Sequence, residues 1–461
     1  MSDPGHRFDP VILREYDIRG TVGDTLTAAD ATAVGRTLGS LVARSGGRFV
    51  AVGRDGRLSS PDLEAALVDG ITNSGLVALR IGCGPTPALY FAAHMLGADA
   101  GIMVTGSHNP PDQNGFKMVV GGKAFWGEMI RKLGQAAREG DWTSGDGRSV
   151  RVSIMDAYVA RLLTGYRSGR EMTVVWDPGN GAAGEVVQAL TQMLPGRHIL
   201  INETIDGTFP AHHPDPTVEA NLEQLKEQVL THGADMGIGL DGDGDRIGVV
   251  DGQGRVIWGD QILAILARDV LRRHPGAPVL ADVKASQVLF DEIARLGGRP
   301  VMCPTGHSII KSRMAAMGAP LAGEMSGHIF FADRYYGFDD AVYAAVRLMD
   351  AVDMSGDSLA GLRDAMPSVV NTPEIRFEVP EERKFAIVEE IKARLHTVGG
   401  IAVDDTDGVR VTTGDGWWLL RASNTQNVLV IRCEAADQSA LERLKQQVRE
   451  QLSRSGIAAD L

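Results

Sequence analysis

Several features are absent from this sequence, and each absence excludes a class of protein. We find no run of roughly 18 apolar residues, the length that a helix needs to cross a bilayer. The opening stretch MSDPGHRFDP holds neither a basic nor an apolar region, so we expect no secretory signal. We also find no low-complexity segment and no exact repeat. The sequence therefore predicts a soluble globular protein with no membrane segment.

Cysteine is scarce as well. The three cysteines, Cys83, Cys303 and Cys433, are far apart and form no C-x-x-C pair. This argues against a disulfide framework and against a thiolate metal site. We expect a protein of the reducing cytoplasm.

Positive charge is in deficit, with 46 basic residues against 59 acidic ones and a net charge of -13. That balance repels a nucleic-acid backbone, and no basic run stands out. Phosphate esters can still bind where local cations outweigh the negative background. We expect no nucleic-acid partner, no membrane partner and no obligate protein partner.

The chain is long enough for three or four domains, at about 100–200 residues each. Strands and helices alternate over most of its 461 residues. This pattern predicts three related α/β domains with mixed, largely parallel sheets, over residues 1–150, 151–256 and 257–368. Short strands flanked by two helices then predict an α+β domain over 369–461.

A polar loop that contains glycine follows an expected strand in each of the first three units, and ligands bind at that end of open α/β sheets. The first loop is TGSHNP, in which Ser107 stands between Gly106 and His108. A serine placed just past a strand, beside a histidine, is typical of a nucleophile. A simple Ser/Asn/Pro turn remains an alternative.

The second loop is DGDGDR, with Asp241, Asp243 and Asp245 at alternate positions. Alternate side chains on an extended backbone share one side, and the clustered carboxylates need a cation such as magnesium. A calcium EF-hand is excluded, because its sixth and twelfth positions, glycine and glutamate, are here Arg246 and Gly252. An acidic structural turn remains the alternative.

Two further loops are weaker signals on their own. GEMSGH places Glu324, Ser326 and His328 at alternate positions, where they can face one way toward sugar hydroxyls. RASNT offers the guanidinium of Arg421 with hydroxyl and amide donors, a set suited to a phosphate dianion. On its own, GEMSGH could also be a glycine-flanked polar turn, and RASNT by itself would be better explained as a hairpin with an exposed arginine.

Outside these four loops, the segment FPAHHPDP contains His212, His213 and Asp215, which could form a metal cluster. We favour a solvated, proline-rich turn for this segment.

Taken in order, the four loops resemble those of the α-D-phosphohexomutase superfamily, most closely its bacterial phosphomannomutase/phosphoglucomutase branch. TGSHNP resembles the phosphoserine loop, DGDGDR the metal loop, GEMSGH the sugar-binding loop and RASNT the phosphate-binding loop. REYDIRG, NGFK, DVKAS and PTGHSIIK match as well, so the resemblance covers nearly the whole chain. It implies four domains around a central active-site cleft, each contributing one loop.

The resemblance also implies roles for individual residues. The implied catalytic residues are Ser107, His108, Lys117, Arg246 and His328, with Lys117 and His328 as candidates for proton transfer. The implied Mg²⁺ ligands are Asp241, Asp243, Asp245 and the phosphorylated Ser107. The implied substrate-binding residues are Tyr16, Arg19, Lys284, His307, Glu324, Ser326, His328, Arg421, Ser423, Asn424 and Thr425. Asn427 departs from the family pattern, which usually has proline there.

The implied reaction is reversible transfer of phosphate between the 1- and 6-positions of a hexose phosphate, through a hexose 1,6-bisphosphate. Met325 within GEMSGH resembles enzymes that accept both mannose and glucose phosphates. A phosphoglucosamine mutase, whose loop resembles GEQSGH, is the alternative within the superfamily. A metal-dependent sugar phosphatase and a catalytically dead regulator are the alternatives outside it.

Overall fold

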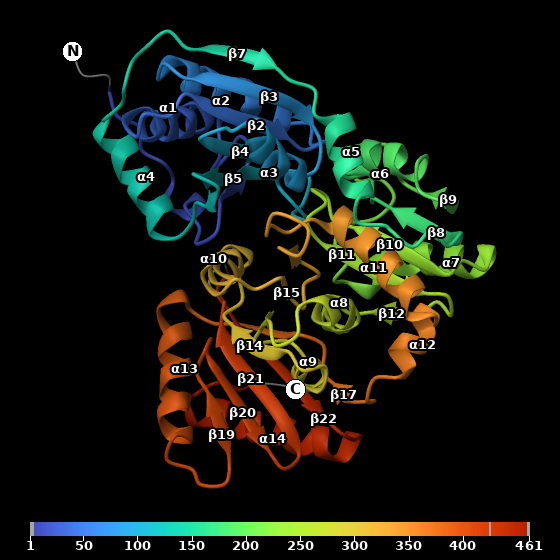
Figure 1. The fold of residues 1–461 in the computed structure, drawn as a ribbon. Helices are drawn as coiled ribbons and strands as arrows, with labels where there is room; N and C mark the ends of the chain where they lie inside the picture. The colour runs from blue at the N-terminus through green and yellow to red at the C-terminus, as the bar shows by residue number, and fades with distance from the viewer. Residues whose placement is uncertain (1–3, 424–425, 459–461) are drawn as a thin grey trace.

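The structure is a computed structural model that describes residues 4–423 and 426–458. Its strands form four separate sheets that follow one another along the chain (Figure 1). The first three sheets mix parallel and antiparallel strands and carry helices, and the fourth is antiparallel. The predicted fold class is confirmed in these terms. The exact domain boundaries remain predictions.

The first sheet has the strand order β1-β5-β4-β2-β3-β7, with β6 beside β5. Successive side chains of its central strand β2 point to opposite faces, so that Val50 and Val52 pack in the same core as Leu67 of α2, whereas Ala51 packs on Leu89 of α3. Its elements are η1 (Pro10–Ile12), β1 (Ile18–Thr21), α1 (Ala28–Arg44), β2 (Phe49–Arg54), α2 (Ser60–Asn73), β3 (Val77–Cys83), α3 (Thr86–Met95), β4 (Ala100–Val104), β5 (Gln113–Val120), β6 (Lys123–Ala124), α4 (Glu128–Glu139) and β7 (Arg148–Arg151).

The second sheet has the order β12-β11-β10-β8-β9, and the third has the order β14-β13-β15-β16. The elements of the second part are α5 (Met155–Leu163), β8 (Met172–Asp177), α6 (Gly184–Thr191), β9 (Gly196–Leu200), η2 (Glu219–Leu222), α7 (Glu223–His232), β10 (Met236–Leu240), β11 (Ile247–Asp251) and β12 (Val256–Ile257). Those of the third are α8 (Gly259–Arg273), β13 (Pro278–Asp282), α9 (Gln287–Arg295), β14 (Arg299–Cys303), α10 (His307–Met317), β15 (Leu321–Gly323), β16 (Ile329–Phe331), α11 (Ala341–Ser355) and α12 (Leu359–Asp364).

The three sheets share one feature that positions the site. β4, β10 and β15 each run parallel to an inner neighbour and antiparallel to the strand that follows them in the chain. The loop joining each of these antiparallel pairs therefore lies at the carboxyl end of the parallel strands. The three predicted loops of the α/β units are these connections.

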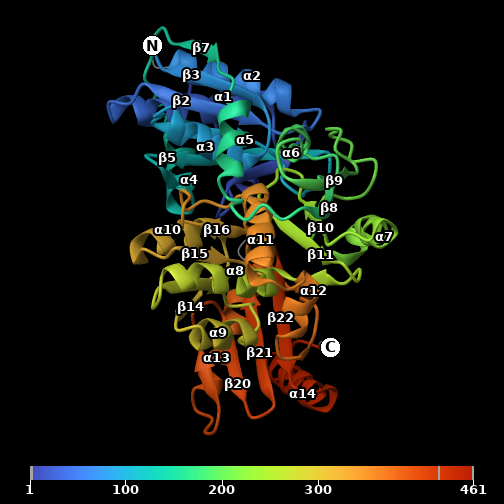
Figure 2. The same ribbon diagram turned by 45° about the vertical axis from the view of Figure 1, so that its right-hand side comes forward.

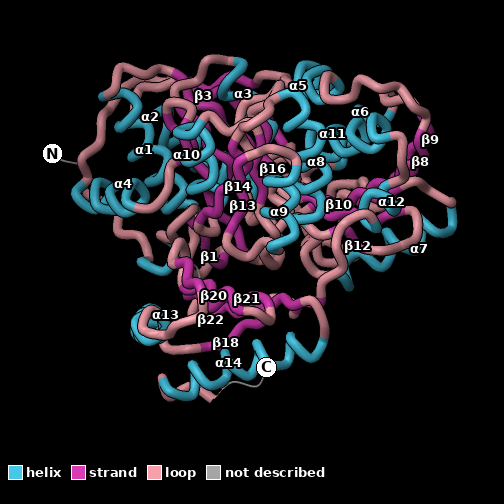
Figure 3. Tube along the Cα trace, turned by 60° about the horizontal axis from the view of Figure 1, so that its bottom comes forward, coloured by secondary structure: helices cyan, strands magenta, loops and turns pink. Residues whose placement is uncertain are grey.

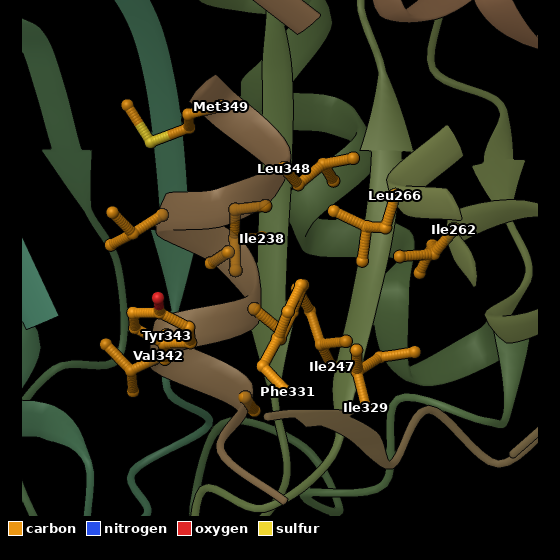
Figure 4. Close-up of a cluster of buried hydrophobic side chains, with 14 of the residues drawn as sticks. Ile238, Ile247, Ile262, Leu266, Ile329, Phe331, Val342, Tyr343, Leu348 and Met349 are labelled. Carbon is orange, nitrogen blue, oxygen red and sulfur yellow. The ribbon is translucent and has the colours of Figure 1, made fainter. Parts of the chain in front are cut away.

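Helix α11 joins the second and third sheets into one core. Every residue from Ala341 to Val352 is buried, as expected of a helix that is apolar on nearly all sides. The helix contacts β10 and β11 of the second sheet, and β16 and α8 of the third (Figure 2). The close-up in Figure 4 shows this core, in which the labelled residues are Ile238, Ile247, Ile262, Leu266, Ile329, Phe331, Val342, Tyr343, Leu348 and Met349.

The fourth sheet has the order β17-β22-β21-β20-β19, with β18 beside β22. Figure 3 shows it with its two helices as a layer of its own beside the three α/β sheets. Its elements are β17 (Val370–Asn371), β18 (Ile375–Glu378), α13 (Glu381–Leu395), β19 (Ala402–Asp404), β20 (Val409–Thr413), β21 (Gly416–Ala422), β22 (Val428–Ala435) and α14 (Gln438–Arg454).

Alternation along β21 decides which way Arg421 faces. Trp418 and Leu420 pack in the core shared with α13 and α14. Trp417 and Leu419 point to the opposite face and pack on Val283 of the third domain. Arg421 has the same parity as Trp417 and Leu419, so it lies on the face turned toward the third domain.

Within residues 4–423 and 426–458, no helix combines the length and the apolar character needed to cross a bilayer. Cys83, Cys303 and Cys433 are free thiols.

Candidate active site

The nucleophile loop follows β4 and brings Ser107 to the second domain. Ser107 is buried, and its Oγ donates a 3.0 Å hydrogen bond to Asp241 Oδ2. The same oxygen lies 3.2 Å from His108 Nδ1. Ser107 has a φ of 49°, a left-handed conformation that costs about 1–2 kcal/mol for a residue other than glycine. The fold maintains that strain at the residue predicted to react.

Buried arginines hold this loop in shape. Arg57 donates to the carbonyl oxygens of Ser107 at 2.8 Å and of Asn109 at 2.6 Å. Arg19, predicted to bind substrate, donates to the carbonyl oxygen of Gly106 at 2.8 Å. A Cβ on Gly106 would lie 2.3 Å from Arg57 Nε, so this position has room only for glycine. The close packing explains why glycine directly precedes the serine.

The acidic loop joins β10 to β11 and gathers its three carboxylates. Asp241, Asp243 and Asp245 are fully buried, and one oxygen of each lies within 4.8 Å of the others. Burial and the two neighbouring carboxylates raise the pKa of Asp241 well above its usual value. The ionised form of Asp241 therefore needs further positive charge beside it.

Lys117 partly neutralises the cluster from the first domain. On β5 it alternates with Phe116 and Met118, which pack into the first core, and so it points to the other face. Lys117 Nζ lies 2.8 Å from Asp243 Oδ2 and also binds Asp245 Oδ2. Burial by itself would raise the pKa of Asp243, but the positive charge of Lys117 has the larger effect and lowers that pKa.

Two carboxylate oxygens of the acidic cluster are not paired with Lys117. In the described part of the chain, Asp243 Oδ1 and Asp245 Oδ1 are buried without a hydrogen-bond partner. An unpaired buried carboxylate oxygen is costly, so each needs a cation or a donor. These oxygens and the Ser107 hydroxyl form a set of hard oxygen ligands of the kind that a divalent cation prefers.

Cations and a neutral imidazole surround the nucleophile. Burial, and then the nearby Arg246 and Arg19, lower the pKa of His108 well below its usual value. Its ring is therefore uncharged at neutral pH. Arg246 extends past the acidic loop, and its Nε donates to His328 Nε2 at 3.0 Å.

The GEMSGH loop joins β15 to β16. Glu324 accepts hydrogen bonds from the Gly306 backbone at 2.7 Å and from Ser326 Oγ at 2.9 Å. Burial opposes ionisation, but His328 and Lys284 outweigh it and lower the pKa of Glu324. The ionised carboxylate can accept hydrogen bonds from sugar hydroxyls. Lys284 itself lies 3.0 Å from Glu374 Oε2.

Histidines from two elements stack beside this loop. The rings of His307, at the start of α10, and His328 lie parallel, with centroids 5.4 Å apart. Between them is the buried carboxylate of Asp339, 3.5 Å from His307 Nδ1 and 3.0 Å from His328 Nδ1. Lys311 Nζ donates to the same carboxylate at 2.9 Å.

The fourth domain contributes Arg421. Its Nε donates to Asp407 Oδ2 at 2.9 Å, and the same oxygen accepts from the Thr305 backbone of the third domain at 3.0 Å. The Thr305 carbonyl in turn accepts from Tyr16 of the first domain at 2.9 Å. Ser423 is buried beside Arg421. The predicted Asn424 and Thr425 lie outside the described residues.

Comparison with known families assigns all four domains. Four models of the phosphoglucomutase/phosphomannomutase family match in order: α/β/α domain I over residues 10–143, domain II over 156–254, domain III over 258–369 and the C-terminal domain over 374–451. The chain belongs to the phosphoglucomutase/phosphomannomutase family.

Individual family members are similar over nearly their whole length. The phosphomannomutase/phosphoglucomutase of Pseudomonas aeruginosa is 45% identical over 96% of this chain and 95% of its own. The phosphoglucomutase of Neisseria gonorrhoeae is 41% identical over 94% of this chain and 95% of its own. A crystal structure of a family protein from Burkholderia thailandensis superposes with a TM-score of 0.93, at 40% identity and covering 98% and 99% of the two chains.

The acidic cluster is a divalent-metal site of this family member. Asp241, Asp243 and Asp245 form a group that could hold such an ion, and the two unpartnered oxygens described above fit it. His212, from the alternative cluster considered in the sequence, instead lies 2.8 Å from Asp177 Oδ2. Among the described residues, neither His212 nor Asp215 belongs to a group that could hold a metal.

Three residues of the site escaped sequence analysis. Arg57 supports the nucleophile loop, Asp407 holds Arg421, and Asp339 lies between two predicted site histidines. Arg57 follows strand β2 in the polar stretch GRDGR, which could have signalled it. Asp339 directly precedes Asp340, the N-cap of α11, and Asp407 lies in an acidic loop, so neither has a distinguishing pattern in the sequence.

Proposed function

We propose that this phosphohexomutase interconverts the 1- and 6-phosphates of mannose and glucose through a phosphorylated Ser107. One observation carries the proposal above the others. A strained, buried serine lies 3.0 Å from a carboxylate of a buried metal cluster, in a chain of this family. A phosphoryl group on that oxygen would lie beside the metal ligands and the cations of the first two domains.

The reaction has two transfers in opposite directions. In the first, a hydroxyl oxygen of the bound sugar phosphate forms a bond to phosphorus while the bond from phosphorus to Ser107 Oγ breaks. The product is a hexose 1,6-bisphosphate. After this intermediate has turned end over end, its other phosphate returns to Ser107, which restores the enzyme.

Charge is the main obstacle, because phosphoserine carries about -1.5 to -2 and meets another phosphate. Lys117, Arg246 and Arg19 supply positive charge around the transferring group. Bound Mg²⁺ would neutralise charge on its equatorial oxygens. Magnesium is the divalent ion we propose, because compact all-oxygen sites next to phosphate are typical of it.

Each transfer also moves a proton. We assign the proton of the attacking hydroxyl to His328, and the proton taken up by the departing Ser107 oxygen to Lys117. In the return transfer both protons move back. Groups that give or accept a proton in this way typically contribute about 10²–10⁴-fold to the rate.

The remaining predicted residues hold the substrate in place. Glu324 and Ser326 would bind sugar hydroxyls, with Lys284 and His307 alongside. Arg421 and Ser423 would hold the phosphate that is not reacting, together with Asn424 and Thr425. The position for the non-reacting phosphate would have to accept the phosphate from either end of the sugar. One enzyme could then act on both 1- and 6-phosphates.

Substrate choice rests on the loop sequence and on the relatives. Met325 lies within the GEMSGH loop, and the relative from Pseudomonas aeruginosa is named for both mannose and glucose phosphates. Neither supports phosphoglucosamine mutase or a sugar phosphatase. We also place the protein in the cytoplasm, where three free thiols would persist.

Product analysis tests this proposal directly. The purified enzyme is given mannose 1-phosphate, glucose 1-phosphate and glucosamine 1-phosphate in parallel, and both 6-phosphates and free phosphate are measured. We expect mannose and glucose 6-phosphates with little free phosphate. Dominant conversion of the glucosamine ester, or stoichiometric release of inorganic phosphate, would contradict the proposal.

A further inference from the structure

Asp407 of the fourth domain accepts hydrogen bonds from two domains on a single carboxylate oxygen. Arg421 Nε donates to Asp407 Oδ2 at 2.9 Å, and the backbone N–H of Thr305 donates to the same oxygen at 3.0 Å. The side chains of Asp407 and Arg421 are only 14% and 7% exposed, so water competes little for these contacts. Hydrogen bonds that involve an ionised group are about twice as strong as neutral ones. Asp407 therefore joins the arginine proposed to hold phosphate to the third domain.

The fold of the fourth domain places Asp407 against Arg421. Strand β20 begins at Val409, which pairs with Leu420 on β21, so the turn before β20 lies beside Arg421. Gly408 in this turn has a φ of 80°, and a Cβ there would lie 2.4 Å from the Leu420 carbonyl oxygen and 2.6 Å from Arg421 Cβ. Only glycine fits such a close approach. The sheet of the fourth domain therefore fixes the backbone beside Asp407.

The third-domain backbone that Asp407 contacts is a meeting point of several site residues. The Thr305 carbonyl accepts from Tyr16 Oη of the first domain at 2.9 Å. The Gly306 N–H donates to Glu324 Oε1 at 2.7 Å. A Cβ on Gly306 would lie 2.6 Å from Tyr16 Cζ, so this segment is tightly packed as well. A short chain of contacts thus runs from the phosphate-holding arginine, through Asp407, to the carboxylate proposed to bind sugar hydroxyls.

We propose that Asp407 is a positioning residue, which orients the guanidinium of Arg421 and fixes it relative to the third-domain residues that bind the sugar. This inference rests on the proposed function. A guanidinium is planar and its N–H donors have fixed directions, so the bond from Nε to Asp407 sets where Nη1 and Nη2 point. These two groups are the pair with which Arg421 would bind a phosphate. Holding them in advance reduces the entropy lost when the phosphate binds.

A purely electrostatic role for Asp407 predicts the opposite effect on binding. The Asp407 carboxylate offsets positive charge beside a site for a dianion, so as a mere counter-charge it would weaken phosphate binding. Its removal would then lower KM. A positioning residue strengthens binding, and its removal raises KM. The sign of the change therefore separates the two roles.

The substitution Asp407→Ala removes both the charge and the acceptor. We expect KM for the 1- and the 6-phosphates to rise roughly tenfold, the lower end for a lost charge-assisted hydrogen bond. The kcat should change less than about threefold, because Ser107 and the acidic cluster lie in other domains. Asp407→Asn keeps an acceptor oxygen without the charge, so its KM should stay within about threefold of wild type.

The matched control is Asp415→Ala, which removes a carboxylate paired with the exposed Arg443 of the same domain. Its KM should equal that of wild type. If Asp407→Ala does not fold, Asp407→Ser keeps a small polar group in the turn and should show the same rise in KM. An unchanged or lowered KM in the folded variant would overturn the proposal.

A double-variant cycle shows whether Asp407 acts through Arg421. In the Arg421→Ala background there is no guanidinium left to orient, so adding Asp407→Ala should raise KM by less than about twofold. A further tenfold rise, as in the wild-type background, would mean that Asp407 acts without Arg421. The positioning role would then be wrong.

Amide hydrogen exchange gives a measurement that does not depend on turnover. The peptide that contains Thr305 should exchange faster in Asp407→Ala than in wild type, and at the wild-type rate in Asp415→Ala. Equal exchange in Asp407→Ala and wild type would show that Asp407 does not hold the third domain, against the proposal. If wild type does not isomerise hexose phosphates, the proposed function fails, while the exchange experiment still tests the contact of Asp407 with Thr305.

Discussion

Ser107 Oγ donates a hydrogen bond of 3.0 Å to Asp241 Oδ2, and this contact joins the first domain to the second. A serine that carries a phosphoryl group has no such proton to give. A phosphoryl group on Ser107, as proposed above, would replace this hydrogen bond with a contact between two negative groups. A cation in the acidic cluster is what can make that replacement favourable.

Phosphate should be found on Ser107 in the purified, active protein. Intact mass and peptide mapping would detect it, and Ser107→Ala should remove it together with most of the turnover. Substrate should still bind to that variant, since the residues proposed to hold it lie on other loops. Ser326→Ala serves as the control, because phosphate should persist on Ser107 there. An active preparation in which Ser107 carries no phosphate at all would reject the scheme.

Removal of divalent metal should abolish activity. Three buried carboxylates face one lysine, so the transferring phosphate meets uncompensated negative charge once the cation is gone. Chelation followed by magnesium should restore the rate, whereas calcium should compete but support little turnover, being larger and looser in geometry. His212→Ala should bind as much metal as wild type. Full activity in chelated enzyme would show that the acidic cluster does not bind a metal that the reaction needs.

Arg421→Ala should raise KM for both the 1- and the 6-phosphates. A lost charge-assisted hydrogen bond is worth about 1.5–3 kcal/mol, or roughly ten- to a hundred-fold in binding. Arg421→Lys should recover only part of this, since lysine cannot form the forked contact. More bisphosphate should also escape during turnover.

The control for that experiment is Arg443→Ala. Arg443 is an exposed arginine of the same domain, paired with Asp415. Its loss should leave both Michaelis constants unchanged. Equal kinetics for Arg421→Ala and Arg443→Ala would make Arg421 a structural arginine instead.

Gly242→Ala should damage the site although it removes no polar side chain. A Cβ at this position would lie 2.4 Å from the Ser107 carbonyl oxygen, so the two loops would have to separate. Overpacking of this kind costs about 1–3 kcal/mol. Gly414→Ala is the control, because a Cβ there meets nothing within 4 Å. Measured rates and melting temperatures of both variants would test this prediction. A fully active Gly242→Ala would show that the two loops can separate without loss of function.

Many of the site residues could be predicted from the sequence because they lie close together in short motifs. The structure does bring the alternating Asp241, Asp243 and Asp245 together, although the loop that carries them is a turn rather than extended backbone. The strand before each loop was recognisable from its apolar run. The role of each site residue remains a prediction, and the loop around Asn424 and Thr425 lies outside the described residues.

Other features depended on contacts that local sequence does not encode. Helix α11 was expected to belong to the third unit, yet its apolar surface is shared between the second and third sheets. Asp339 reads as part of a helix start, and its contact with His328 depends on how the loop after β16 folds back.

The sequence by itself determined the family, the four-part α/β and α+β order, and the four polar loops, because strand alternation and loop spacing are set by neighbouring residues. The tertiary structure alone decided which loops meet. Lys117 reaches Asp243 across 126 positions of sequence, and Ser107 reaches Asp241 across 134. Such contacts follow from the packing of whole sheets, in which each side chain's direction is fixed by buried neighbours, and no local pattern carries that information.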